Sequence, residues 1–132
     1  MILYKNRRHY KYTLVDSFSR KIEIETDHKL GNDFLYLDEN GILFISKGYS
    51  WDGPSGPTID TKNFMQGSLV HDALYQLMRE KHLDLKYRKY ADELLRTMCI
   101  EDRMSKLRAL FVYWAVRIFG ESSAIPDTQK AP

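Results

Sequence analysis

The residues best suited to chemistry lie close together in the chain, at His71, Asp72 and Tyr75. On a helix, His71 and Tyr75 share a face, whereas Asp72 lies about 100° round from His71. A histidine titrates near neutral pH and can act as a general base, and a carboxylate is a hard oxygen ligand for a cation. The segment therefore predicts either a base beside a cation ligand or a buried polar pair.

A second carboxylate, Asp92, is expected on the following helix. If it accepts a hydrogen bond from His71 or Tyr75, it fixes the imidazole orientation and favours one tautomer, as a general base requires. The alternative is a hydrogen-bonded staple between helices, because polar groups in a core are normally paired. Arg117 is expected as a structural ion partner of Asp92 or of Asp52. The candidate catalytic residues are thus His71, Tyr75 and Asp92, with the structural role left open.

Residues 47–67 precede the predicted first helix and hold four of the seven glycines. Glycine permits positive φ, so such a loop can aim carbonyl oxygens at one point, and calcium takes about six to eight oxygens. Carbonyls of Gly53 and Gly56 with the Asp72 carboxylate form the candidate calcium site. No set of His and Cys has the spacing of a zinc site. The alternatives are a plain connector, and an Asp72 that only interacts favourably with the helix dipole.

The first third of the chain is predicted to form strands. Residues 21–26 alternate charged and β-branched side chains, which predicts a half-buried strand. Residues 10–15 are its expected partner. Two apolar runs, 34–37 and 42–45, flank a loop that ends in Asn-Gly and predict a hairpin. Together they indicate a small antiparallel sheet of about four strands.

The second half is predicted to hold three helices. The first begins near Ser68 as its cap, the second spans about 86–100, and the third runs from residue 103 or 105 to 119, with Gly120 as its C-terminal cap. The apolar face of the third helix is expected in the core, with a partner-docking surface as the alternative. That face consists of Leu107, Leu110, Phe111, Trp114 and Ile118.

These patterns predict an α+β fold in one domain over residues 1–120, with a flexible tail over 121–132. The net charge of +2 is too small to indicate a specific nucleic-acid partner. The single cysteine excludes an internal disulfide framework. The longest apolar run, 109–116, is too short for a transmembrane segment, and the first residues lack a signal-peptide pattern. The basic cluster at 5–11 is expected as a solvated face, with a lipid- or nucleic-acid-facing patch as the alternative.

Four short motifs occur in order along the chain. They are Tyr-x-Trp-Asp-Gly-x-Ser at 49–55, His-Asp-x-Leu-Tyr at 71–75, Tyr-Ala-Asp at 90–92 and Ala-Val-Arg-Ile-Phe-Gly at 115–120. With these motifs, residues 42–120 resemble the phage-associated family known as domain of unknown function 1353. The resemblance implies a phage or prophage origin and no established activity. It also implies the host cytoplasm as location, incorporation in the virion, and other virion proteins as partners.

A weaker resemblance concerns Gly-Pro-x-x-Asp at 56–60 followed by His-Asp-x-x-Tyr at 71–75. This arrangement is similar to the calcium loop and active-site helix of phospholipases of the A-two type. The loop departs from that family in its two prolines, and one cysteine cannot form the disulfides of the secreted enzymes. The resemblance implies a lipid substrate and assigns the roles of base to His71, calcium ligand to Asp72, and support to Tyr75 and Asp92.

Two functions are therefore expected for the chain. The first is a phage-encoded accessory or virion structural protein in which the His-Asp-Tyr/Asp cluster is a polar staple between helices. The alternative is a calcium-dependent lipid esterase, similar to phospholipase A-two, that acts in host entry or lysis.

Overall fold

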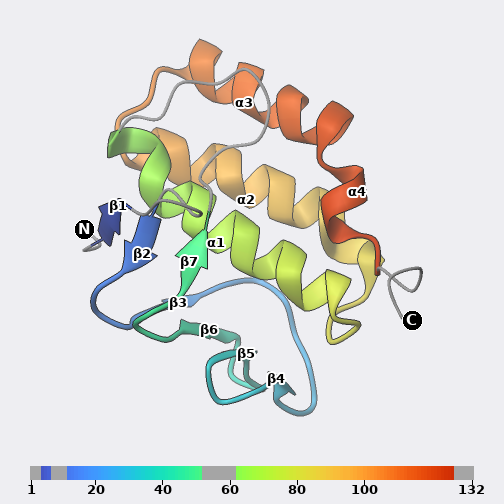
Figure 1. Ribbon diagram of the computed structural model, residues 1–132. Helices are drawn as coiled ribbons and strands as arrows, with labels where there is room; N and C mark the ends of the chain where they lie inside the picture. The colour runs from blue at the N-terminus through green and yellow to red at the C-terminus, as the bar shows by residue number, and fades with distance from the viewer. Residues whose placement is uncertain (1–3, 7–11, 52–61, 127–132) are drawn as a thin grey trace, which may run out of the picture. The chain divides into compact units, whose positions relative to one another are not determined.

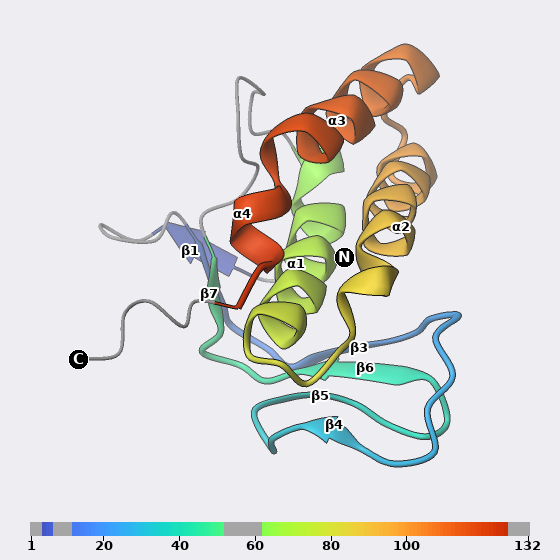
Figure 2. The same cartoon turned by 90° about the vertical axis from the view of Figure 1, so that its right-hand side faces the viewer.

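The computed structural model describes residues 4–6, 12–51 and 62–126. Strands come first and helices follow, which confirms the predicted α+β class (Figures 1 and 2). Residues 1–52 and residues 53–132 form two compact units, one of strands and one of helices.

The strands of the first unit pair antiparallel in two small sheets. The predicted hairpin is confirmed, because its two arms pair from Leu35↔Ile45 to Leu37↔Leu43. The first sheet has the strand order β1 (Tyr4–Asn6), β2 (Tyr12–Leu14), β7 (Ser50–Trp51). The second has the order β3 (Phe18–Lys21), β6 (Ile42–Ile45), β5 (Leu35–Leu37), β4 (Leu30–Gly31).

The hairpin turn forms because its residues satisfy the backbone locally. The Asp38 carboxylate accepts hydrogen bonds from the amides of Asn40 and Ile42, both at 2.9 Å. Gly41 has a φ of +78°, a conformation that costs little only for glycine. The Asn-Gly signal therefore marked the turn correctly.

The prediction of a strand over residues 21–26 is wrong beyond Lys21. Lys21 faces Ile42, the first residue of β6, and the hairpin turn begins beyond it, so the next residues have no β6 neighbour. The alternation of burial is nevertheless present, since Ile22 and Ile24 are buried. The predicted partner is also wrong: β2 pairs with β1 and β7 instead.

The second unit contains four helices and a 3₁₀ turn in its described residues. The α1 and α2 helices lie side by side in both views, α3 contacts α2, and α4 contacts α1 and α3 (Figures 1 and 2). The bounds are α1 (Lys62–Arg79), η1 (Leu85–Tyr87), α2 (Arg88–Glu101), α3 (Lys106–Phe119) and α4 (Glu121–Ala124). No helix in these described residues is long and apolar enough to cross a membrane.

The predicted start of the first helix is wrong, whereas the predicted end of the third helix is confirmed. Ser68 does not cap α1, which begins at Lys62; its buried hydroxyl donates a hydrogen bond to the Met65 carbonyl at 3.0 Å. Gly120 is the C-terminal cap of α3, as predicted: its amide donates to the Val116 carbonyl at 2.9 Å, and the chain then continues into α4. The segment expected as a flexible tail therefore begins with a helical turn whose Ala124 is buried.

The predicted inward face of α3 is wrong for four of its five residues, and the fifth, Leu110, is partly buried. Leu107, Phe111, Trp114 and Ile118 are each more than half exposed. The core instead receives smaller side chains from the opposite side of the helix. These smaller side chains are Ala109, Val112 and Val116, which form one buried cluster with Phe64, Leu95, Cys99 and Met104.

Candidate functional site

The Asp92 carboxylate is the centre of the candidate site and is completely buried. His71 Nε2 lies 2.7 Å from its Oδ1 atom, and the Tyr75 hydroxyl donates to the same oxygen at 2.6 Å. Arg117 donates through Nη1 to Oδ2 at 2.9 Å. Since these residues belong to α1, α2 and α3, one carboxylate connects three helices.

Helical spacing explains how α1 presents two partners to Asp92. His71 and Tyr75 are four residues apart, so they share a face, as the sequence predicted. Their ring centroids lie 4.1 Å apart. The structure therefore brings His71, Tyr75 and Arg117 to Asp92, as predicted. Asp52, the other expected partner of Arg117, lies outside the described residues.

Arg88 is a part of the site that the sequence analysis did not identify. Its Nε donates to the Tyr75 hydroxyl at 3.0 Å, and its Nη2 donates to the main-chain carbonyls of Val116 and Arg117 at 3.0 and 2.8 Å. The last carbonyls of a helix lack intrahelical partners and carry partial negative charge. Arg88 therefore extends the Asp92 network to the C-terminal end of α3. One signal was available: Arg88 precedes Asp92 by four residues and so shares its face of α2.

The hydrogen bonds of the network stabilise the charged forms of Asp92 and Arg117 and the neutral form of Tyr75. Burial by itself raises the pKa of Asp92, but the hydrogen bond and charge of His71, followed by the hydrogen bonds of Tyr75 and Arg117, hold that pKa below its ordinary value. Burial raises the pKa of Tyr75, and its hydrogen bond to Asp92 raises it further. The hydrogen bond to Asp92 also raises the pKa of Arg117. Asp92 is thus a buried anion among donors.

The orientation of His71 also has chemical consequences. In the neutral imidazole, an Nε2–H that donates to Asp92 leaves the lone pair on Nδ1. The His71 side chain is 12% exposed, whereas that of Asp92 is 0% exposed. A carboxylate that fixes one tautomer of a partly accessible imidazole is the arrangement of a general base. The same contacts also form an interhelical staple.

The candidate calcium site is described only in part. Asp72 lies on α1 beside His71 and is partly exposed. Gly53 and Gly56 lie outside the described residues. Within the described ranges, no group of three or more His, Cys, Asp or Glu residues is arranged to hold a metal ion. The calcium site stays a prediction.

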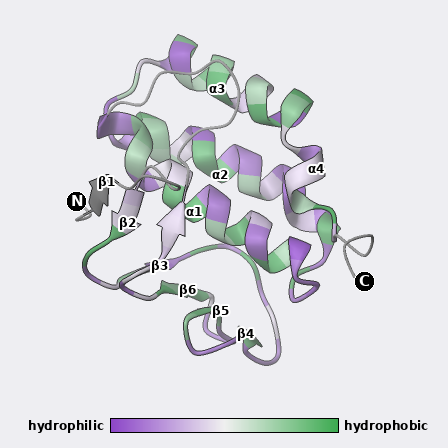
Figure 3. Ribbon diagram, viewed as in Figure 1, coloured by the Kyte–Doolittle hydropathy of each residue, from purple (hydrophilic) through white to green (hydrophobic). Residues whose placement is uncertain are grey.

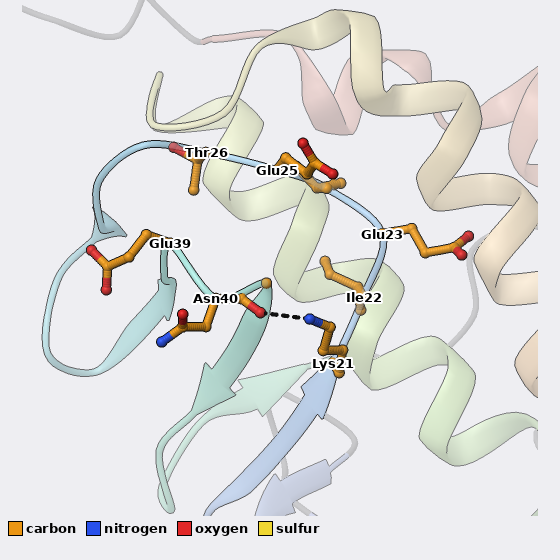
Figure 4. A pocket seen from close by; sticks show the side chains of 9 residues that line it. Lys21, Ile22, Glu23, Glu25, Thr26, Glu39 and Asn40 are labelled. Atoms are coloured by element: carbon orange, nitrogen blue, oxygen red, sulfur yellow. Dashed lines mark hydrogen bonds between the residues drawn. The ribbon is translucent and has the colours of Figure 1, made fainter.

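A separate pocket of about 570 Å³ lies in the first unit, and no motif in the sequence indicated it. Figure 4 shows it beside the extended segment after β3, where Lys21 donates to the Asn40 carbonyl at 2.9 Å. The carboxylates of Glu23 and Glu39 point to opposite sides of this view. Carboxylates that do not converge make a poor cation site, so this pocket is a weaker candidate than the Asp92 network.

Comparison with known proteins identifies a family. A family model described as "Protein of unknown function (DUF1353)" matches residues 28–116. No curated protein and no solved structure matches the chain. The matched residues include His71, Tyr75, Arg88 and Asp92.

Proposed function

The chain belongs to the DUF1353 family of proteins of unknown function, and on that premise we propose that it is a phage-encoded accessory or virion structural protein. In this role the network of Asp92, His71, Tyr75 and Arg117 is a polar staple that holds three helices together. Other virion proteins would be its partners. It would be made in the host cytoplasm and incorporated in the virion.

The complete burial of Asp92 among donors from two neighbouring helices is the observation that supports this role. Both carboxylate oxygens have partners, and Arg117 supplies a compensating positive charge. A buried anion is tolerated only when it is paired and hydrogen-bonded. These contacts with side chains of α1 and α3 support a role for Asp92 in holding the helices together.

We expect Asp92→Ala to destabilise the folded protein by about 3–5 kcal/mol, because it leaves Arg117 and Tyr75 without their buried acceptor. For a chain of this size the melting temperature should fall by roughly 10–20 °C. Thermal unfolding followed by circular dichroism measures the change. The control is Asp33→Ala, which removes an exposed ion pair with Lys29 and should leave the melting temperature unchanged. Equal melting temperatures for the two variants would contradict the staple.

A calcium-dependent lipid esterase is the second candidate, and the orientation of His71 is the observation that favours it. Nε2 faces the buried carboxylate, and the other ring nitrogen is left for a water or a substrate proton. In this role Tyr75 and Asp92 would support the base. Asp72, Gly53 and Gly56 would supply the calcium ligands.

Hydrolysis of phospholipid vesicles, with calcium and with a chelator, tests the esterase. Calcium-dependent release of fatty acid by the wild type, lost in a folded His71→Gln variant, would establish it. The staple proposal predicts no release under either condition. A folded wild type that releases no fatty acid at any calcium concentration would exclude the esterase.

A further inference from the structure

An exposed apolar stripe runs along α3. It consists of Leu107, Phe111, Trp114 and Ile118, and we call these four residues the α3 stripe. Their exposed fractions are 80%, 54%, 54% and 66%, and the neighbouring Phe119 is 60% exposed. In Figure 3 most of α3 has the green colour that marks hydrophobic residues. A contiguous apolar surface of this kind marks an interaction site.

The stripe is exposed because the opposite side of α3 supplies the core. Ala109, Val112 and Val116 belong to the buried cluster, and at 100° per residue they lie about half a turn away from the stripe. The helix thus has two apolar sides. Only the side with small side chains is used within the described chain.

The spacing of the stripe indicates a helical partner. Its positions are separated by four, three and four residues, the spacing of a seam at which two helices interdigitate. A second copy of the chain supplies a helix with the same seam. We propose that two copies of this protein associate through their α3 stripes in an antiparallel, two-fold symmetric pair. This inference goes beyond the proposed function and does not depend on the Asp92 network.

The area available is sufficient for such a pair. A large apolar or aromatic side chain offers roughly 150–250 Å², so the exposed parts of the four stripe residues amount to about 500 Å² in each copy. Two copies would bury about 1,000 Å², which is the area that a specific protein interface needs to reach. Contacts at the edges of the stripe would add to this area.

Charge and helix dipoles favour the antiparallel orientation. In a parallel pair the two Lys106 side chains, both exposed, would meet at the same end. In an antiparallel pair each Lys106 lies near the opposite end of the partner helix, where Glu121 is exposed. Opposed macrodipoles add a favourable contribution. A dyad near the middle of the stripe then places Leu107 opposite Ile118, and Phe111 opposite Trp114.

A lipid surface is the competing occupant, and two features make it less favourable. The α3 stripe is narrow, whereas helices that lie in a membrane interface have a broad apolar face. The exposed carboxylate of Glu121 also lies directly after the C-terminal end of α3, where it would meet anionic headgroups. The seam therefore fits a helix better than a bilayer.

Light scattering coupled to size-exclusion chromatography tests the pair on the full chain. We expect the wild type to show the mass of a dimer that dissociates on dilution, and Phe111→Ser and Trp114→Ser to show the mass of a monomer. Phe34→Ser is the control, because it removes a 44% exposed aromatic ring elsewhere and should leave the dimer intact. Circular dichroism verifies that each variant is folded.

Cross-linking tests the orientation. Leu107→Cys mixed with Ile118→Cys should form a disulfide-linked dimer under mild oxidation, and Leu107→Cys alone should not. Cys99 stays out of the reaction because it is completely buried and burial raises the pKa of its thiol to about 12. A monomeric wild type at submillimolar concentration would overturn the proposal. So would binding to anionic vesicles by a chain that remains monomeric, or equal cross-linking of Leu107→Cys alone.

Discussion

The protonation of Asp92 is coupled to folding. Burial raises its pKa, yet the donors His71, Tyr75 and Arg117 outweigh burial and hold the pKa below its ordinary value of 3.8. A carboxyl with a lowered folded-state pKa binds more protons when unfolded. It therefore contributes stability above the unfolded pKa and loses that contribution as the pH falls through the folded pKa.

We expect the stability advantage of the wild type over Asp92→Asn to be constant near neutrality and to shrink below about pH 4. Urea unfolding of both proteins at pH 7 and pH 3 measures it; an advantage that persists unchanged at pH 3 would show that Asp92 is protonated or unpaired.

Most of this network can be predicted from the sequence because its signals are local. His71 and Tyr75 follow from helical spacing, and Asp92 and Arg117 follow from charged residues at inward positions of neighbouring helices. Arg88 was missed because it binds main-chain carbonyls, whose location depends on where α3 ends against α2. The choice between base and staple could not be made from residue types, since both roles need the same contacts.

At the scale of single elements, the β5–β6 hairpin depends on its turn glycine. Gly41 has a φ of +78°, and a Cβ there would approach the Ile22 carbonyl oxygen to 3.0 Å. Gly48 has a φ of +91° with nothing within 4 Å of such a Cβ. We expect Gly48→Ala to cost about 1 kcal/mol through backbone strain alone, and Gly41→Ala to cost about 2–3 kcal/mol because of the added contact. Chemical denaturation of both variants provides the comparison. Equal losses would mean that the Ile22 segment moves aside freely.

The elements also show where local patterns fail. The 34–37 and 42–45 hairpin was predictable because both its partners and its turn are adjacent in sequence. The alternation over 21–26 predicted correctly which side chains are buried. It did not predict strand pairing, because β6 begins opposite Lys21 and the residues beyond Lys21 lie beside the hairpin turn instead of a strand. On α3, large apolar residues suggested the core. The close approach of neighbouring helices selected the small side chains of the opposite face instead.

At the scale of the whole molecule, the order of the patterns was sufficient to predict the α+β class. The chain divides into two compact units, and the single domain over residues 1–120 stays a prediction. Tertiary contacts decided the rest: which strands share a sheet, and which side of α3 is left exposed. The residues that connect α1, α2 and α3 lie within the second unit, so its stability should respond to the network directly.

A double-mutant cycle between His71 and Asp92 tests the staple most directly. The free energy of unfolding is measured for the wild type, His71→Ala, Asp92→Ala and the double variant. If the two side chains stabilise the fold through each other, the double variant loses less stability than the two single losses together. We expect a coupling energy of at least about 1 kcal/mol. Losses that add to within about 0.5 kcal/mol would contradict the account, since they would show that His71 and Asp92 act independently.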